Sequence, residues 1–324
     1  MDVILSNSIN AMIDPMTAAY AIAAIGIALH FGFTGLLNFG QAAFMAVGAY
    51  GFAIATLNYH LPFWTAIGIS LLLSVILAFV LGIPTLRLRS DYLAIVTIAA
   101  AEMLRYIVST TSAAPLTGGP QGLNGYSNDF YALNPIPVGT YGFWNLQYSE
   151  RELWVRLVGW SFAILSAIVL AILVRSPWGR VIKGIREDED AIRSLGKNVY
   201  AYKMQSLVVG GLMGTVAGIL FVIPRSVQPG NYATTLTFFL WTILLLGGAS
   251  TVIGSVIGSM IFWGLLSLSD DLLNAGVNSG VINFITTDQI GTIRFMIVGL
   301  SLMLLVIFRP QGLFGNKKEL QFNV

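Results

Sequence analysis

The feature that most constrains this chain is a series of long apolar stretches that contain almost no charged residues. A helix needs roughly 20 apolar residues to cross a bilayer core about 30 Å thick. Windows that approach this length, bounded by charges, proline or polar clusters, occur at residues 15–32, 41–57, 63–83, 92–108, 153–174, 204–223, 236–246, 251–268 and 292–308. The window at 236–246 is short. If it did not cross the membrane, every later segment would lie on the opposite side from the one predicted.

The composition agrees with a membrane protein. Only 10% of the residues are charged and 56% are hydrophobic, whereas soluble domains carry about 25% charged residues. A formal net charge of +2 and the high hydrophobicity exclude a disordered chain. The windows are continuously apolar instead of alternating, which favours helices over a β-barrel. We therefore predict an all-α fold, a polytopic membrane helix bundle of about 8–10 transmembrane helices.

The basic residues predict an orientation, because Lys and Arg gather on the cytoplasmic side of membrane proteins. Residues 87–89, 175–203 and 309–318 hold two, seven and three of the 17 Lys and Arg residues, and nine crossings from an outside N-terminus place all three segments inside. The acidic start of the chain does not fit a secretory signal peptide, so the first window is expected to stay in the protein. The predicted domains are a transmembrane domain at 1–308, with an outer loop at 109–151 and a cytoplasmic loop at 175–203, and a cytoplasmic tail at 309–324.

The predicted outer loop is rich in proline and glycine, which is typical of turns and not of helix. Its aromatic side chains fit a belt at the membrane–water interface better than a docking or gating surface. These aromatic residues are Tyr126, Phe130, Tyr131, Tyr141, Phe143, Trp144 and Tyr148.

Several kinds of catalytic chemistry are absent from the sequence. The only Gly-Lys pair, Gly196-Lys197, is followed by Asn198, so the chain lacks a nucleotide-binding P-loop and is not expected to hydrolyse ATP by itself. His30 and His60 cannot form a zinc-protease motif, and they are expected to have structural hydrogen bonds. There is no Gly-x-Ser-x-Gly turn and no cysteine. We predict no catalytic residue, no metal site and no cofactor bound by this chain.

Glycines spaced four residues apart predict close helix packing. Lipid tails are as apolar as leucine, so membrane helices associate where small residues let their backbones touch. The spacing occurs at Gly210, Gly214 and Gly218, and again at Gly254 and Gly258. We expect these faces to pack within the subunit; a seam between two subunits is the alternative.

Two segments interrupt the apolar windows with glycine and polar residues, at 31–43 and 247–251. Irregular backbone at membrane depth is tolerated where it is buried in protein or lines a cavity, and such interruptions indicate a transport path. We predict a path at 31–43, and at 247–251 either a path or a tight turn. Glu102 is the only acid inside a window, and Arg105 follows it three residues later on the same helical face. A structural ion pair is the favoured interpretation of these two residues, and a functional site is the alternative.

The loop at 175–203 predicts a short amphipathic helix that Pro177 opens and Gly196 closes. Val181, Ile185, Ile192 and Leu195 share one face at helical spacing, and residues of both charges cover the rest. The near-zero net charge of this helix argues against binding to a membrane surface. Docking into a groove on a soluble partner is one interpretation, and a solvated loop is the other.

Six sequence blocks occur in an order that resembles the branched-chain amino-acid ABC-transporter permease family, LivM type. They are TGLLNFGQAAF at 34–44, LRLRSDYLAI at 86–95, LTGGPQG at 116–122, IREDE at 185–189, LGG at 246–248 and RPQGLF at 309–314. The resemblance covers nearly the whole chain.

The resemblance implies one subunit of an importer in a bacterial or archaeal cell membrane. Its expected partners are a second, related permease of the LivH type, two cytoplasmic ABC ATPases that use ATP and Mg²⁺, and an extracytoplasmic binding protein, with no nucleic acid. The loop helix would be the coupling helix that contacts the ATPases. The residues expected at that contact are Val181, Ile185, Arg186, Glu187, Asp188, Glu189, Ile192, Leu195 and Gly196.

The implied substrate is a branched-chain or other neutral amino acid. Its path would need polar groups for the charged head and apolar walls for the side chain. The candidates are Asn38, Gln41 and Thr97 for the polar part, Phe39 and Phe44 for the wall, and Glu102. Some relatives handle urea or amides, which remain alternatives, as do a secondary carrier that needs no ATPase and a purely structural membrane subunit.

Overall fold

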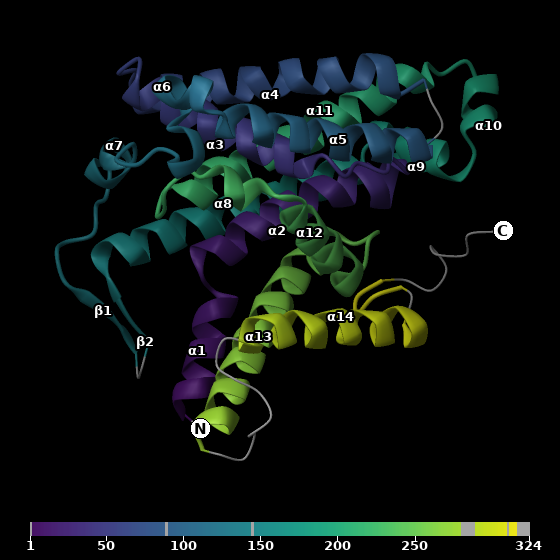
Figure 1. Cartoon of the computed structure of the whole chain (residues 1–324). Helices are drawn as coiled ribbons and strands as arrows, with labels where there is room; N and C mark the ends of the chain where they lie inside the picture. Colours follow the sequence, from purple (N-terminus) through teal and green to yellow (C-terminus); the bar gives the residue numbers. More distant parts are fainter. Residues whose placement is uncertain (1, 88–89, 144–145, 280–288, 310, 316–324) are drawn as a thin grey trace.

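The computed structural model describes residues 2–87, 90–143, 146–279, 289–309 and 311–315. Figure 1 shows a bundle of long helices with short, irregular elements at one end. The predicted helical membrane fold is confirmed, and the one exception to an all-α chain among these residues is a two-stranded hairpin.

Each apolar window contains a helix. Within the described residues, six helices are long and apolar enough to cross a membrane by length and composition, and α3, α12 and α14 carry shorter apolar runs. The helices are α2 (Pro15–Ile27), α3 (Gln41–Leu57), α4 (Phe63–Thr85), α5 (Ser90–Ser109), α8 (Glu150–Arg175), α11 (Val199–Val222), α12 (Thr234–Gly247), α13 (Val252–Asn278) and α14 (Ile290–Phe308).

The centre of the bundle is α11, which lies between α2 and α3. Its glycine face makes this possible, since a Cβ atom on Gly218 would lie 2.0 Å from the carbonyl oxygen of Met45 in α3. A Cβ atom on Gly210 would lie 2.7 Å from the carbonyl oxygen of Gly26 in α2. Gly258 of α13 packs in the same way against the backbone of α12. These glycines therefore bring helices of this one chain into backbone contact.

The first helix was not predicted. α1 (Asp2–Met12) precedes the first apolar window and packs against α13, where the side chain of Met12 contacts Gly264. The chain then turns at Asp14, whose carboxylate accepts a hydrogen bond from the Met16 amide and caps α2. Pro15 follows at the first helical position, where a missing N–H costs nothing.

The outer loop holds more structure than turns. Its short elements are η2 (Thr111–Ala113), α6 (Ala114–Thr117), η3 (Gly119–Gln121), α7 (Asn128–Ala132), β1 (Thr140–Phe143) and β2 (Leu146–Ser149), and a further short helix, η4 (Pro229–Tyr232), packs beside η3. β1 and β2 pair antiparallel, with Thr140 opposite Ser149. The prediction of turns was therefore wrong for the hairpin and for these short helices.

The prediction of an aromatic belt was also wrong for part of this loop. Tyr126, Phe130 and Tyr148 are buried within the protein. The hydroxyl of Tyr126 donates to the carbonyl oxygens of Val222 and Arg225, which ties the loop to the end of α11. Burial raises the pKa of the Tyr126 hydroxyl, so it stays a donor over the accessible pH range. Trp144 lies outside the described residues.

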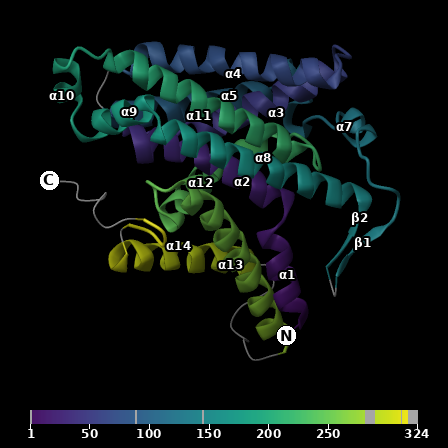
Figure 2. The same cartoon turned by 180° about the vertical axis from the view of Figure 1, so that it is seen from behind.

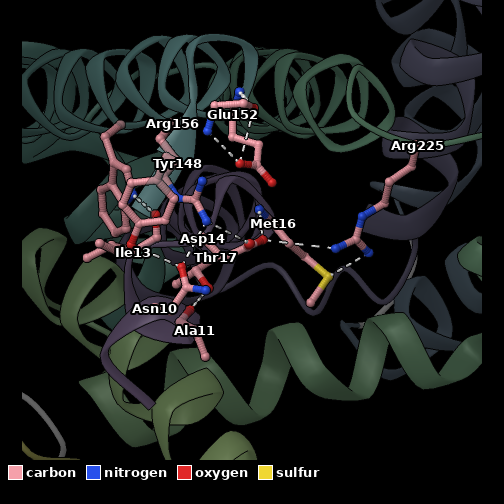
Figure 3. Close-up of polar contacts among 12 residues, drawn as sticks. Asn10, Ala11, Ile13, Asp14, Met16, Thr17, Tyr148, Glu152, Arg156 and Arg225 are labelled. Carbon is pink, nitrogen blue, oxygen red and sulfur yellow. Dashed lines mark hydrogen bonds and ion pairs between the residues drawn. The ribbon is translucent and has the colours of Figure 1, made fainter. Parts of the chain in front are cut away.

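A polar cluster joins α1, α2, α8 and the end of α11 near the hairpin (Figure 3). The guanidinium of Arg156 donates to Asn10 Oδ1 at 2.8 Å and lies 3.8 Å from the ring centroid of Tyr148. Arg156 and Arg225 both approach the carboxylate of Asp14, at 3.8 Å and 3.9 Å. The cluster therefore fastens the α1–α2 corner to α8 and α11.

Replacing Arg156 with Ala is expected to lower the stability of the protein by about 2 kcal/mol, because hydrogen bonds from charged groups contribute roughly that much. The matched control is Arg151→Ala, since Arg151 is exposed and lies over the ring of Tyr131. Thermal unfolding of the purified protein in detergent measures both. Equal unfolding temperatures for the two variants would contradict the role given to this cluster.

The segments that carry the predicted cytoplasmic charges meet at one end of the bundle. The guanidinium of Arg87 lies over the ring of Tyr200 at 5.5 Å, and Phe314 lines one groove together with Arg175 and Lys183. Figure 1 shows this end, with α9 and α10, opposite the end with the hairpin. We call it the basic end, and the end with residues 110–149 the outer end. Residues 88–89 and 316–324 lie outside the described residues.

Candidate functional site

Both predicted interruptions occur, and they touch one another. After α2 the chain forms one π-helical stretch, η1 (Ala28–Phe33), and then runs without regular structure until α3 begins at Gln41. The second interruption is a turn between α12 and α13. A Cβ atom on Gly32 would lie 1.7 Å from the carbonyl oxygen of Ala249, so no other residue fits at position 32. The interruptions therefore form one continuous region, which we call the junction (residues 28–40 and 247–251).

Asn38 and Gln41 hold the junction to the core. Both side chains are fully buried. The amide of Asn38 donates to His30 Nδ1 at 3.0 Å, and that of Gln41 donates to the carbonyl oxygen of Gly210 at 2.9 Å. Nδ1 of His30 is then an acceptor, so the proton of the neutral ring is on Nε2. Nε2 lies 3.3 Å from the carbonyl oxygen of Leu207 and donates to it. The buried amide groups of Asn38 and Gln41 are thus satisfied inside the protein.

Phe39 is held through its backbone from two sides. Its amide donates to Thr97 Oγ1 of α5 at 3.0 Å, and its carbonyl oxygen accepts from Thr237 Oγ1 of α12 at 3.3 Å. The ring stacks on Trp241 with centroids 4.5 Å apart. Phe44 is fully buried against α11, where Gly211 leaves room for its ring. Four of the proposed path residues, Asn38, Phe39, Gln41 and Thr97, therefore meet at the junction.

The path itself differs from the sequence prediction in one respect. Asn38, Gln41, Phe44 and Thr97 are fully buried and have their partners inside the chain, so they do not line an open path in this conformation. Phe39 and Glu102 are the proposed path residues that keep partial exposure. The sequence could not show this, because an amide side chain at an interruption looks the same whether it faces a path or a backbone carbonyl.

The predicted coupling helix is two helices. α9 (Pro177–Glu187) begins with the Ser176 side chain as its cap, and α10 (Glu189–Ser194) follows after a single extended residue, Asp188. The Asp188 carboxylate accepts from the amides of Asp190 and Ala191, at 3.0 Å and 2.9 Å. Aspartate is a strong helix cap, and this competing local bond starts a new helix where the sequence pattern suggested continuity.

The break also separates the four predicted apolar residues. Ile185 is buried, Val181 and Ile192 are half-buried, and Leu195 is 74% exposed. The prediction of one shared face was therefore wrong for Leu195. Glu187, Asp188 and Gly196 also lie at the surface of the basic end.

Arg186 connects this loop to the junction. Its guanidinium donates to the carbonyl oxygen of Gly32 and pairs with the carboxylate of Glu187. Gly35, with a positive φ of 75°, lets the junction backbone pass against the Arg186 side chain, since a Cβ atom there would lie 3.2 Å from it. On α10, Glu189 pairs with Lys203 at the start of α11. Trp178 of α9 also donates to Gln205 of α11 at 2.8 Å. The loop is therefore attached both to the junction and to the central helix.

The family model for the permease component of branched-chain amino acid transport systems matches residues 13–308. The chain belongs to this permease family. It is 31% identical to the high-affinity branched-chain amino acid permease protein LivM of Escherichia coli K12, over 93% of this chain and 69% of that protein. No solved structure matches the chain significantly.

Two further relatives extend the comparison. The permease is 24% identical to a probable LivM of Methanocaldococcus jannaschii, over 92% of this chain and 91% of that protein. It is 23% identical to LivH of Escherichia coli K12, over 92% of each chain. The chain is therefore similar to both permease types along almost its full length.

In the permease, Glu102 acts as more than the partner of Arg105. Arg105 Nη2 lies 2.7 Å from its carboxylate, as the favoured interpretation predicted. The other carboxylate oxygen accepts from the amide of Thr234 at 2.9 Å and from the Thr234 hydroxyl. Thr234 is the first residue of α12, so Glu102 caps that helix, whose amino end attracts negative charge. Sequence reasoning missed this contact because it joins residues 132 positions apart.

Replacing Glu102 with Leu is expected to destabilise the permease by about 2 kcal/mol, since Arg105 and the start of α12 both lose a charged partner. The double variant Glu102→Leu, Arg105→Leu is expected to recover part of this loss, because it leaves no unpaired cation. Thermal unfolding of the two single variants and the double variant measures the coupling. If the double variant lost as much stability as the two single variants added together, the pair would contribute nothing.

Other residues of the junction also escaped the sequence analysis. Thr34 Oγ1 lies 2.7 Å from Ser206 Oγ of α11, and Trp241 packs against both Phe31 and Phe39. Thr237 and Trp241 lie one helical turn apart on the face of α12 that meets the junction. That spacing is a weak signal, and it becomes recognisable only once the partner segment is known.

Proposed function

We propose that this permease is a transmembrane subunit of an ABC importer for branched-chain amino acids, driven by separate cytoplasmic ATPases and fed by an extracytoplasmic binding protein. The observation that carries the proposal is the contact of Arg186 with the Gly32 carbonyl oxygen. It connects the loop at the basic end directly to the interrupted helix. An ATPase that moved the loop would therefore move the junction.

The partners follow from what the chain lacks and what it resembles. The sequence has no P-loop, so ATP and Mg²⁺ would be bound by partner ATPases. Its similarity to both LivM and LivH supports a pair of related permeases, with a LivH-type chain as the second subunit. The basic end would face the cytoplasm of a bacterial or archaeal cell, and the outer end would meet the binding protein.

The mechanism requires contacts that differ between two states. A partner shifts a conformational equilibrium only if it binds the two conformations with different affinity. The exposed surface of the loop, with Glu187, Asp188 and Leu195, is the proposed ATPase contact. Movement of α9 would pull on Gly32 through Arg186, and movement of α10 would act on Lys203 through Glu189. These movements would open the junction. Asn38, Gln41 and Thr97 would then line the substrate path, beside Phe39 and Phe44.

The decisive experiment is reconstitution in proteoliposomes of the permease with its second permease, the ATPases and the binding protein. We expect ATP-dependent uptake of leucine, isoleucine or valine, and ATP hydrolysis that rises when loaded binding protein is added. Uptake of urea or amides in their place would change the substrate class. Uptake by this polypeptide alone, driven by an ion gradient, would instead establish a secondary carrier.

A further inference from the structure

A groove of about 760 Å³ lies between α8 and α13 at the basic end. Figure 2 shows α8 leading into α9 at this end of the molecule. Its walls are apolar, with Ile164 and Ile168 from α8 and Ile253 and Val256 from α13. From Ile164 to Arg175, helix α8 rises about 16 Å, which is close to half of a bilayer core about 30 Å thick. The groove therefore has the length of one lipid leaflet.

Two cations lie at the basic end of this groove. Arg175 is the last residue of α8, and Lys183 projects from α9, where its Nζ lies 5.6 Å from the ring centroid of Phe33. Neither has a carboxylate partner within 4.0 Å among the described residues. In this part of the structure, the residues that line the groove include no acidic side chain. The groove therefore combines an apolar channel with uncompensated positive charge at one end.

A buried hydroxyl at the same end also lacks a partner. Ser250 lines the groove and is 8% exposed, and its Oγ has no hydrogen-bond partner within the described part of the chain. Buried hydroxyl groups are nearly always paired, so an unpaired one that lines a groove points to a ligand atom. The amino end of α13 begins two residues later and adds partial positive charge.

We propose that this groove binds one anionic phospholipid of the leaflet at the basic end. Its phosphate would lie among Arg175, Lys183 and Ser250, and one acyl chain would follow the apolar walls toward Ile164. A zwitterionic lipid would fit the walls equally well, but it has no net negative charge to offset the two cations. Because Lys183 belongs to α9, the lipid would also attach the coupling loop to the membrane.

The test is native mass spectrometry of the purified permease, with any subunits that co-purify, titrated with phosphatidylglycerol and with phosphatidylcholine of the same acyl chains. We expect one phosphatidylglycerol to bind more tightly than phosphatidylcholine. The double variant Arg175→Gln, Lys183→Gln should lose this preference, by about fivefold for each cation, since a basic residue near an anionic surface contributes about 1 kcal/mol. Arg180→Gln removes an exposed charge of α9 outside the groove and should leave the preference unchanged.

Two further variants test the apolar part. Ala171→Trp would fill the groove and should weaken binding of both lipids. Ile168→Cys places the only cysteine in the chain on the groove wall, where a benzophenone maleimide can be attached and activated by light. A photo-crosslinked permease that is heavier than the labelled variant by the mass of one phospholipid supports the proposal. A product with a peptide, from this chain or another subunit, would overturn it, as would equal affinity for the two lipids or an unchanged preference in the double variant.

Discussion

Replacing Gly218 with Ala is expected to remove most of the yield of folded permease. The added Cβ atom would lie 2.0 Å from the carbonyl oxygen of Met45, and that atom belongs to the backbone of α3 and cannot rotate away. Helices α11 and α3 would have to separate along the centre of the bundle. Overpacking of a core typically lowers stability by about 1–3 kcal/mol and sometimes more. We expect the loss of stability from Gly218→Ala to be at or above the upper value.

The control is the same substitution at Gly299, in the described part of α14. This glycine is exposed, and a Cβ atom added to it would have no neighbouring atom of the described residues within 4 Å. Alanine is a better helix former than glycine by about 1 kcal/mol, so Gly299→Ala should leave the yield of folded protein unchanged or raise it. Fluorescence-detected gel filtration and thermal unfolding report both effects. Similar yields for the two variants would contradict the packing described for α11.

Replacing Arg186 with Gln is expected to uncouple ATP hydrolysis from transport in the reconstituted importer. The variant loses the guanidinium that joins α9 to the Gly32 carbonyl oxygen, a charged hydrogen bond that contributes roughly 1.5–3 kcal/mol. This corresponds to about a tenfold or larger fall in uptake. Basal ATP hydrolysis should persist, because most of the exposed surface of the loop is unchanged.

Arg193→Gln is the matched control for this prediction. Arg193 lies on α10, and its guanidinium pairs with Glu189 and Asp190 of the same short helix. Exposed pairs of this kind contribute at most about 1 kcal/mol, so uptake should stay within roughly fivefold of the wild type. If both variants lost uptake to the same extent, the contact with Gly32 would have no special part in coupling.

The apolar windows predicted the helices well because membrane insertion imposes a length and a composition that are visible in the sequence. The same criterion missed α1, which precedes the first window and packs along α13. The break at Asp188 was missed because hydrophobic spacing continues across it, while the decisive interaction is a carboxylate bound to two backbone amides.

The interruption of the helix was predicted from the sequence, but the contacts of its polar side chains were not. The glycine-rich interruption predicted at 31–43 contains irregular backbone at residues 35–40, whereas residues 41–43 form the first turn of α3. Whether Asn38 and Gln41 faced a path or the core depended on His30 and Gly210, which lie on two other elements of the fold. Such contacts are set by tertiary packing, and no local pattern records them.

The single extended residue between α9 and α10 has a mechanical consequence. A residue has two soft dihedral angles, so α9 and α10 could rotate relative to each other about Asp188 and keep their own backbone hydrogen bonds, once the contact of Ile192 with Gly184 separates. α9 contacts the interrupted segment through Arg186 and the central helix through Trp178, whereas α10 contacts the central helix through Glu189. If partner ATPases move the loop as proposed, Asp188 would act as a hinge, and one displacement of the loop would move the interrupted segment and the central helix by different amounts.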